Sequence, residues 1–364
     1  MNYGLPYQGN KSRIAERLGK CLPPANTFVD LFCGGCAMTH WAMLSGKYRN
    51  YLCNDINPML PQAFLDAANG KFRNEDRWVS RAEFNRLKNT DPYAALCYSY
   101  ANNMTDYCYS EKREPYERAL HRMVCFHDFT EWEKLDPQSA PLLKQVLGNI
   151  SDTRMRRLAA AEILRQMRGS NPLYGCEAGH MQQAMSNVTR LNNIEYLECV
   201  QSMCGFHINT STVTVSSKDY REVAIPDNSI IYCDPPYVGK RDYKYLRGMQ
   251  FDYDAFYDWC ERQTQPVFIS EYSMPEDRFE CVAEIQIKRK MDVHKHTMCD
   301  EKLWRPKRQI ARLRLYPGSI KVCGMPHFWK CPGCSAFLSG QSFPAGTGVA
   351  LWRCLSSRGR SHVL

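Results

Sequence analysis

The chain has 364 residues, 44% of them hydrophobic, and a formal net charge of +9, so it is long enough for a sizeable core in two lobes. It has no run of 18 apolar residues and no basic segment followed by an apolar one at its start, so we expect neither a membrane protein nor a secreted one. Its 18 cysteines are scattered without paired spacing, which favours reduced thiols in a cytoplasm over a disulfide framework.

The amino-terminal 60 residues carry the pattern of a nucleotide-binding unit. We predict a buried strand at 27–32, a glycine turn at 33–37, a helix at 38–44 and a second strand at 51–54. Asp55 follows that strand about 20 residues after the glycines, where a carboxylate can grip ribose hydroxyls. The dinucleotide pattern GxGxxG is absent. A cofactor with ribose but no pyrophosphate is therefore favoured, and S-adenosyl-L-methionine fits that description.

The middle of the chain, roughly 70–200, does not continue a sheet pattern. Residues 151–169 have helical spacing and five arginines, which indicate either a solvated helix face or contacts to phosphate: Arg154, Arg156, Arg157, Arg165 and Arg168. Upstream lies a stretch dense in aromatic and amide side chains: Tyr93, Tyr98, Tyr100, Asn102, Asn103, Tyr107 and Tyr109. These residues could read adenine edges or stack on bases, or they could be core tyrosines and helix caps.

The segment Asp234-Pro235-Pro236-Tyr237 follows an apolar run at 229–233 that we predict to be a buried strand. Open α/β sheets bind ligands at the carboxyl ends of their strands. An acid, two rigid prolines and an aromatic ring there suit a planar base with an exocyclic amine. The alternative for this segment is an ordinary strand end, because Pro-Pro usually just terminates a strand.

Further elements complete an α/β pattern in the last third of the chain. We predict strands at 212–215 and 266–270, a crossover helix at 253–262, and late antiparallel strands at 286–290 and 309–315.

Six segments, in this order along the chain, resemble motifs of the Dam-type, DNA adenine-specific N6 methyltransferases. They are Tyr7-Gln8-Gly9-Asn10-Lys11, Phe28 to Gly35, Asn54-Asp55-Ile56-Asn57, Lys218 to Val223, Asp234 to Tyr237, and Glu301-Lys302-Leu303-Trp304. One departure is Cys36, which stands where the family usually has glycine or another small residue. The resemblance implies an α/β fold, namely a Rossmann-like methyltransferase sheet with a helical inserted target-recognition domain.

The resemblance also implies roles for individual residues. The catalytic residues would be Asp234, Pro235, Pro236 and Tyr237. The S-adenosyl-L-methionine site would comprise Tyr7, Lys11, Asp30, Phe32, Gly34, Gly35, Asp55, Asp219, Tyr220 and Asp234. Lys11 could instead neutralise Asp30 or Asp234. No metal is expected in this site.

Residues 238–245 follow the catalytic motif and mix basic and aromatic side chains. We expect this loop to grip double-stranded DNA around a flipped base, chiefly through Lys240, Arg241 and Tyr243. The alternative is an ordinary exposed loop. The expected protein is a monomer or a weak dimer in the cytoplasm of a bacterial cell or a phage-infected host, and it takes part in DNA adenine methylation, including restriction–modification.

We divide the chain into a discontinuous catalytic domain (1–65 and 205–315), an inserted DNA-binding domain (66–204) and a basic tail (316–364). From Lys302 onward there are 11 Lys and Arg and no Asp or Glu, which leaves 36 basic against 38 acidic residues before it. DNA binding by the enzyme body would then depend on local patches. In the tail, Cys331 and Cys334 could join two of Cys323, His327 and Cys354 in a zinc site, although a second CxxC is missing.

Three classes of function remain open. The first is a site-specific methyltransferase acting on the N6 amine of adenine in DNA. The second is a methyltransferase for another amine, such as cytosine N4, an RNA base or a protein amide; cytosine N4 enzymes favour Ser and protein amide enzymes Asn at the first motif position, so Asp234 favours adenine. The third is a non-catalytic DNA-binding relative, which would not need both the cofactor residues and the catalytic motif.

Overall fold

The computed structural model describes residues 3–73, 75–167, 187, 210–237, 251–288, 298–309, 353–354 and 362–363. The chain divides into two compact units, residues 1–312 and 313–364, and each is described by itself. In the second unit, the described residues form a two-stranded antiparallel ladder of β8 (Arg353–Cys354) and β9 (His362–Val363).

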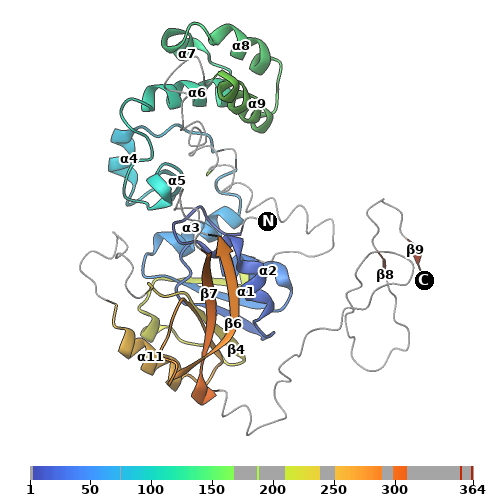
Figure 1. The fold of residues 1–364 in the computed structure, drawn as a ribbon, viewed down its shortest axis with the longest axis vertical. Helices are drawn as coiled ribbons and strands as arrows, with labels where there is room; N and C mark the ends of the chain where they lie inside the picture. Colours follow the sequence, from blue (N-terminus) through green and yellow to red (C-terminus); the bar gives the residue numbers. More distant parts are fainter. Residues whose placement is uncertain are drawn as a thin grey trace. The chain divides into compact units, whose positions relative to one another are not determined.

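A seven-stranded sheet organises the first unit, and Figure 1 shows β7 and β6 together in it. The strand order is β3-β2-β1-β4-β5-β7-β6. The first five strands of that order run parallel, and β7 is antiparallel to both of its neighbours. The strands are β1 (Thr27–Asp30), β2 (Asn50–Asn54), β3 (Val213–Ser216), β4 (Ser229–Cys233), β5 (Val267–Glu271), β6 (Phe279–Lys288) and β7 (Met298–Pro306). The predicted α/β, Rossmann-like methyltransferase sheet is confirmed.

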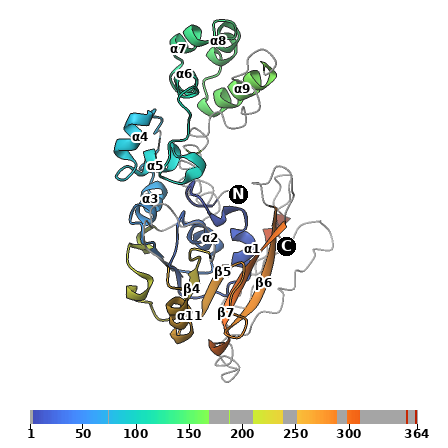
Figure 2. The same cartoon turned by 60° about the vertical axis from the view of Figure 1, so that its left-hand side comes forward.

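Helices cover both faces of the sheet because the strand residues alternate between two hydrophobic cores. Phe28 points into one core, with α1 (Ala15–Lys20), α2 (Ala37–Ser45) and α3 (Met59–Ala68). Val29, its neighbour, points into the other core, with α11 (Tyr253–Arg262). Figure 2 shows α1 and α2 on one side of the strands and α11 beside β4. Burial on both faces explains why β4 is apolar throughout.

Helices fill the interval between β2 and β3, and the predicted boundary at residue 65 lies inside α3. They are α4 (Arg81–Leu87), α5 (Pro92–Cys97), α6 (Glu114–Phe126), α7 (Thr130–Leu135), α8 (Ala140–Gly148) and α9 (Thr153–Gln166). A capping box between Ser80 and Glu83 begins α4, and Asp91 caps α5. The side chains of α4 and α5 join the core shared with α1–α3, whereas α6–α9 enclose a separate core around Trp132. We call α6–α9 the helical lobe. The division of the chain into domains stays a prediction.

The structure corrects one expectation for this region and decides between two alternatives for part of another. Arg156 neither lies on a solvated helix face nor has its guanidinium group available to contact phosphate. It is 3% exposed and donates to the carbonyl oxygens of Val124, Ile150 and Ser151 at 2.5–2.8 Å. Tyr93, Tyr98 and Tyr109 are core residues, which is the second of the two alternatives for the aromatic stretch, whereas Tyr100 is 62% exposed.

Late in the chain, residues 286–288 of the predicted strand form the end of the longer β6, and residues 289–290 lie outside the described residues. The strand predicted from residue 309 is wrong at its start, because 307–309 form a helical turn and Gln309 is buried there. Its amide donates to the carbonyl oxygens of Gln263 and Gln265 and its carbonyl accepts from Val267 N, so Gln309 closes the end of the sheet. Residues 310–315 lie outside the described residues.

Candidate active site

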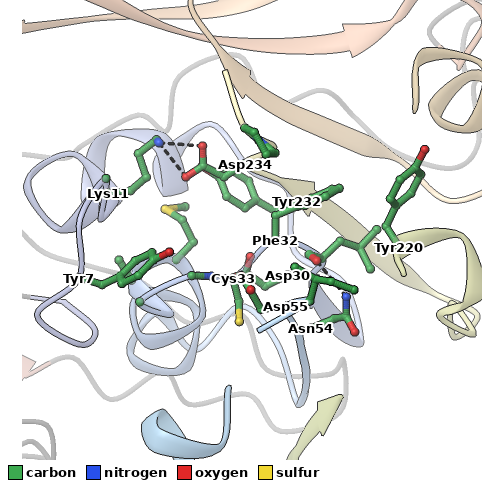
Figure 3. A pocket seen from close by; sticks show the side chains of 18 of the residues that line it. Tyr7, Lys11, Asp30, Phe32, Cys33, Asn54, Asp55, Tyr220, Tyr232 and Asp234 are labelled. Atoms are coloured by element: carbon green, nitrogen blue, oxygen red, sulfur yellow. Dashed lines mark hydrogen bonds and ion pairs between the residues drawn. The ribbon is translucent and has the colours of Figure 1, made fainter. Parts of the chain in front are cut away.

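A cavity of about 320 Å³ lies at the carboxyl ends of β1, β2 and β4, within the size range typical of small-molecule sites. Figure 3 shows Asp30, Asp55 and Asp234 around it, with Tyr7 and Lys11 on one side and Tyr220 on the other. Parallel strands bring the three aspartates together, because residues at the carboxyl ends of neighbouring strands meet at one edge of the sheet. All ten residues predicted for the cofactor site line this cavity, including Gly34, Gly35 and Asp219.

The glycine turn after β1 is shaped by close approach of other groups. Gly34 has a φ of +47°, and a Cβ there would lie 3.2 Å from the Tyr7 ring. A Cβ on Gly35 would lie 2.6 Å from Nδ2 of Asn10. Cys36 has a φ of +54°, the left-handed conformation that explains a preference for glycine at this position. Its Sγ lies 3.4 Å from Sγ of Cys33, and both thiols are free.

Asp55 holds this turn as well as facing the cavity. Its carboxylate accepts hydrogen bonds from Gly34 N and Asn57 N, both at 2.9 Å. Burial raises the pKa of Asp55 to about 6, and the two backbone donors oppose that shift. Asp30 is more deeply buried, accepts a hydrogen bond from Thr39 Oγ1 at 2.7 Å, and has its pKa raised by burial to about 7.

Asp219 and Tyr220 occupy the far end of the cavity. Tyr220 packs among rings, with centroids 5.3–6.0 Å from those of Phe32, Phe251, Phe256 and Trp259. The Asp219 carboxylate is held by Arg221, through the side chain and the backbone N–H, and these hydrogen bonds lower its pKa. This end of the cavity offers an aromatic wall with a carboxylate at its rim.

Asp234 follows β4 directly, and its side chain is 18% exposed. Lys11 Nζ lies 2.7 Å from both carboxylate oxygens, as the dashed lines in Figure 3 show. Of the alternatives for Lys11, the structure thus places it on Asp234. Burial raises the pKa of Asp234 to about 6 despite the opposing effect of Lys11.

The prolines and Tyr237 are held by later elements. The carbonyl oxygen of Pro236 accepts a hydrogen bond from Tyr253 at 3.0 Å. In the part of the chain that the structure describes, no donor reaches the carbonyl oxygen of Pro235. The Tyr237 ring packs edge-on against Tyr272, with centroids 4.7 Å apart, and lies 4.7 Å from Lys11 Nζ.

Glu301, on β7, begins the sixth motif segment of the sequence analysis, which gave it no role in the site. Its carboxylate accepts from the Tyr237 hydroxyl and from Ser270 Oγ, the latter at 2.6 Å. Lys11 Nζ is 3.8 Å away. One signal could have identified it: Glu301 shares an inward face of β7 with Leu303, and an acid on the buried face of a strand needs a specific partner.

Several predicted features lie outside the described residues. Among them are the DNA-contacting residues Lys240, Arg241 and Tyr243 and four candidate zinc ligands of the tail, whereas Cys354 lies in β8. Among the described residues there is no group of three or more potential metal ligands. None of the described helices is both long and apolar enough to cross a membrane.

Comparison with known proteins gives two findings. Residues 7–140 match the family of D12 class N6 adenine-specific DNA methyltransferases. The chain is 34% identical over 113 residues to the retron Ec67 DNA adenine methylase of Escherichia coli. That alignment covers 27% of this chain, and the chain spans 38% of that relative's length. The predicted resemblance to DNA adenine methyltransferases is confirmed for this amino-terminal part, which includes Lys11 and Asp55 but ends before Asp234.

Proposed function

We propose that this chain is a site-specific DNA methyltransferase that transfers the methyl group of S-adenosyl-L-methionine to the N6 amine of a flipped-out adenine. The observation that carries the proposal is the position of Asp234, a half-buried carboxylate after β4, in the same cavity as Asp55 and the glycine turn. Methyl transfer to a base amine requires a group that accepts hydrogen bonds from the amine, next to a binding site for the nucleotide part of the cofactor. The family match over residues 7–140 supports the same chemistry.

The cavity suits this cofactor. S-adenosyl-L-methionine would supply a methyl group on a positively charged sulfonium. The carboxylates of Asp30, Asp55 and Asp234 favour a cation, and the ring of Tyr220 offers a wall for a purine. We assign Asp55 to the ribose hydroxyls and Asp219 with Tyr220 to the adenine. The methionine end would lie by Tyr7, Lys11, Asp30, Phe32, Gly34 and Gly35.

For the substrate, we assign the two amine hydrogens of adenine to Asp234 and the carbonyl oxygen of Pro235. Accepting both hydrogens would favour a pyramidal nitrogen with a free lone pair, to which the methyl group would pass as its bond to sulfur breaks. The surplus proton of the methylated amine would then leave to Asp234. The Tyr237 ring would stack on the base, with Pro236 beside it. Because a duplex hides the amine, the adenine must leave the stack, at a cost of a few kcal/mol. Much of the rate enhancement would then come from positioning.

The DNA-gripping role of Lys240, Arg241 and Tyr243 is part of this proposal, as are the assignment of double-stranded DNA as the partner and a monomeric or weakly dimeric state. Since the reaction needs DNA and S-adenosyl-L-methionine, we place it in the cytoplasm of a bacterial cell or a phage-infected host.

Nucleoside mass spectrometry of DNA from cells that express the chain tests the proposal. We expect N6-methyladenine from the wild-type chain and none from Asp234→Ala, while calorimetry finds the affinity of the variant for S-adenosyl-L-methionine within a few-fold of wild type. N4-methylcytosine would identify a different amine as the acceptor. The absence of any methylated base, or undiminished methylation by Asp234→Ala, would refute the assignment.

A further inference from the structure

Lys11 and the proposed substrate amine require the same hydrogen-bond acceptor, Asp234. Its ammonium group lies 2.7 Å from both oxygens of Asp234, the carboxylate that must accept a hydrogen from the substrate amine in the proposed reaction. An acceptor engaged by a charged donor on both oxygens is a poor partner for a neutral amine, because charge-assisted hydrogen bonds are about twice as strong as neutral ones. The ammonium therefore needs somewhere else to go when the base enters.

Glu301 offers that second place. Its Oε1 lies 3.8 Å from Lys11 Nζ, so a displacement of about 1 Å brings the two within hydrogen-bond distance. The Glu301 side chain is 3% exposed and the Lys11 side chain 11% exposed, so little water competes for either. Burying a charged carboxylate costs free energy unless an opposite charge pairs with it. The hydroxyls of Tyr237 and Ser270 donate hydrogen bonds to Glu301 Oε1, but both are uncharged.

Glu301 also positions the Tyr237 ring, which would stack on the substrate base. The Tyr237 hydroxyl donates to the same carboxylate, and the Tyr237 ring lies 4.7 Å from Lys11 Nζ. The Glu301 carboxylate therefore contacts Tyr237, which would stack on the base. A short movement of Lys11 would bring its ammonium group from Asp234 to the same carboxylate.

We propose that Glu301 is a positioning residue for methyl transfer, which fixes the Tyr237 ring and takes Lys11 from Asp234 when the substrate amine enters. This inference rests on the proposed function for its chemistry, but the sharing of Lys11 between two carboxylates is a property of the protein alone. The proton stays on Lys11 throughout; only its hydrogen-bond partner changes.

The groups that face Asp234 come from every element around it: Lys11, Asp30, Asp55, Tyr232, Tyr237 and Glu301. Burial raises the pKa of Asp234 most, Lys11 lowers it and the charge of Glu301 raises it further. Glu301→Gln removes that charge but keeps an oxygen that can accept from Tyr237 and Ser270. We expect Lys11 to stay on Asp234 in this variant, and the pKa of Asp234 to fall.

The first test compares single-turnover methylation of adenine-containing duplex DNA between pH 5 and 9. For Glu301→Gln we expect a 10- to 100-fold lower rate, an acid limb displaced to lower pH, and unchanged affinity for S-adenosyl-L-methionine. Glu284→Gln is the matched control, because it makes the same change on β6, where Glu284 is exposed and pairs with Lys302 at 2.8 Å. It should behave as wild type. An unchanged rate in Glu301→Gln, or a slower rate with an unmoved acid limb, would refute the proposal.

The second test is independent of turnover. If Lys11 is shared, removing Asp234 leaves it on Glu301, so Glu301→Gln should lower the melting temperature more in an Asp234→Asn background than in wild type. Additive losses of melting temperature would overturn the sharing of Lys11. If the wild-type chain makes no N6-methyladenine, the proposed function fails, whereas this thermodynamic cycle still decides whether the two carboxylates compete for Lys11.

Discussion

Two buried cations, Lys11 in the pocket and Arg156 in the helical lobe, have opposite surroundings. Arg156 is surrounded by neutral acceptors, chiefly the carbonyl oxygens of Val124, Ile150 and Ser151. Lys11 faces two carboxylates, Asp234 and Glu301, and lines the same cavity as Asp30 and Asp55. Arg156 thus joins α6 to the segment that precedes α9, whereas Lys11 is one positive charge facing more than one carboxylate. Burial of a charge does not mark an active site; an imbalance among buried charges does.

The largest expected effect lies on the Arg156 side of this comparison. Arg156→Ala should lower the free energy of unfolding of the helical lobe by about 3 kcal/mol, because it leaves several buried carbonyl oxygens without a donor. Hydrogen exchange should show the loss in α6 and α9 but not in β1 or β4. A variant that weakens the pocket and the helical lobe equally would contradict the separation of the two cores.

On the pocket side, Asp55→Ala should weaken S-adenosyl-L-methionine binding by about 30-fold, or about 2 kcal/mol. The change removes the proposed ribose partner and also the acceptor for Gly34 N and Asn57 N. Calorimetry measures the affinity, and the Asp66→Ala variant, which loses a surface pair with Lys71, is the control. Unchanged affinity would remove Asp55 from the ribose site.

The three carboxyl groups around the cavity predict that the affinity for S-adenosyl-L-methionine depends on pH. Burial raises the pKa values of Asp55 and Asp234 to about 6 and of Asp30 to about 7. These groups lose their protons as the pH rises from 5 to 7.5, so the affinity for the cationic cofactor should rise by about 10-fold over that interval. The neutral product S-adenosyl-L-homocysteine serves as the control and should show a smaller rise. Equal pH dependence for both ligands would show that the charge of the pocket does not act on the sulfonium.

The same pKa values predict the direction in which pH changes the stability of the protein measured without added ligand. A carboxyl group whose pKa is higher in the folded state holds a proton that the unfolded chain releases. The free energy of unfolding contributed by these groups should therefore fall between about pH 4 and pH 7. Chemical denaturation at pH 5 and pH 7.5 measures it.

The smallest effect is expected at a helix start. Ser80→Ala removes the capping box of α4 and should cost about 1 kcal/mol of stability, without changing cofactor affinity. Thermal denaturation with and without S-adenosyl-L-methionine measures both quantities. A loss of cofactor affinity would show that α4 is coupled to the pocket.

Local pattern was enough to predict much of the fold. The strand at 229–233 and the helix at 253–262 coincide with β4 and α11, because each is a compact apolar pattern between turn residues. The glycine turn and the acids at the carboxyl ends of β1, β2 and β4 meet in one cavity, as expected for parallel strands. These predictions required only neighbours in sequence and the general geometry of α/β sheets.

What the sequence could not predict depends on distant pairings. Glu301 meets Tyr237 only because β7 runs antiparallel beside β5, and no local signal specifies that position in the sheet. Arg156 lies in the same helical pattern as the other arginines of its run, and its burial is decided by how α9 packs on α6. Polar residues that are buried for different reasons look alike in a linear pattern.

The separate core of α6–α9 has an evolutionary consequence. Its apolar side chains pack around Trp132 and, among the described residues, form a cluster distinct from both cores of the sheet. Recombination that exchanges residues 114–166 for another helical segment would thus leave the packing around β1 and β4 intact. A lineage could acquire a new helical lobe by a single crossover event at each end, rather than by a long series of compensating substitutions.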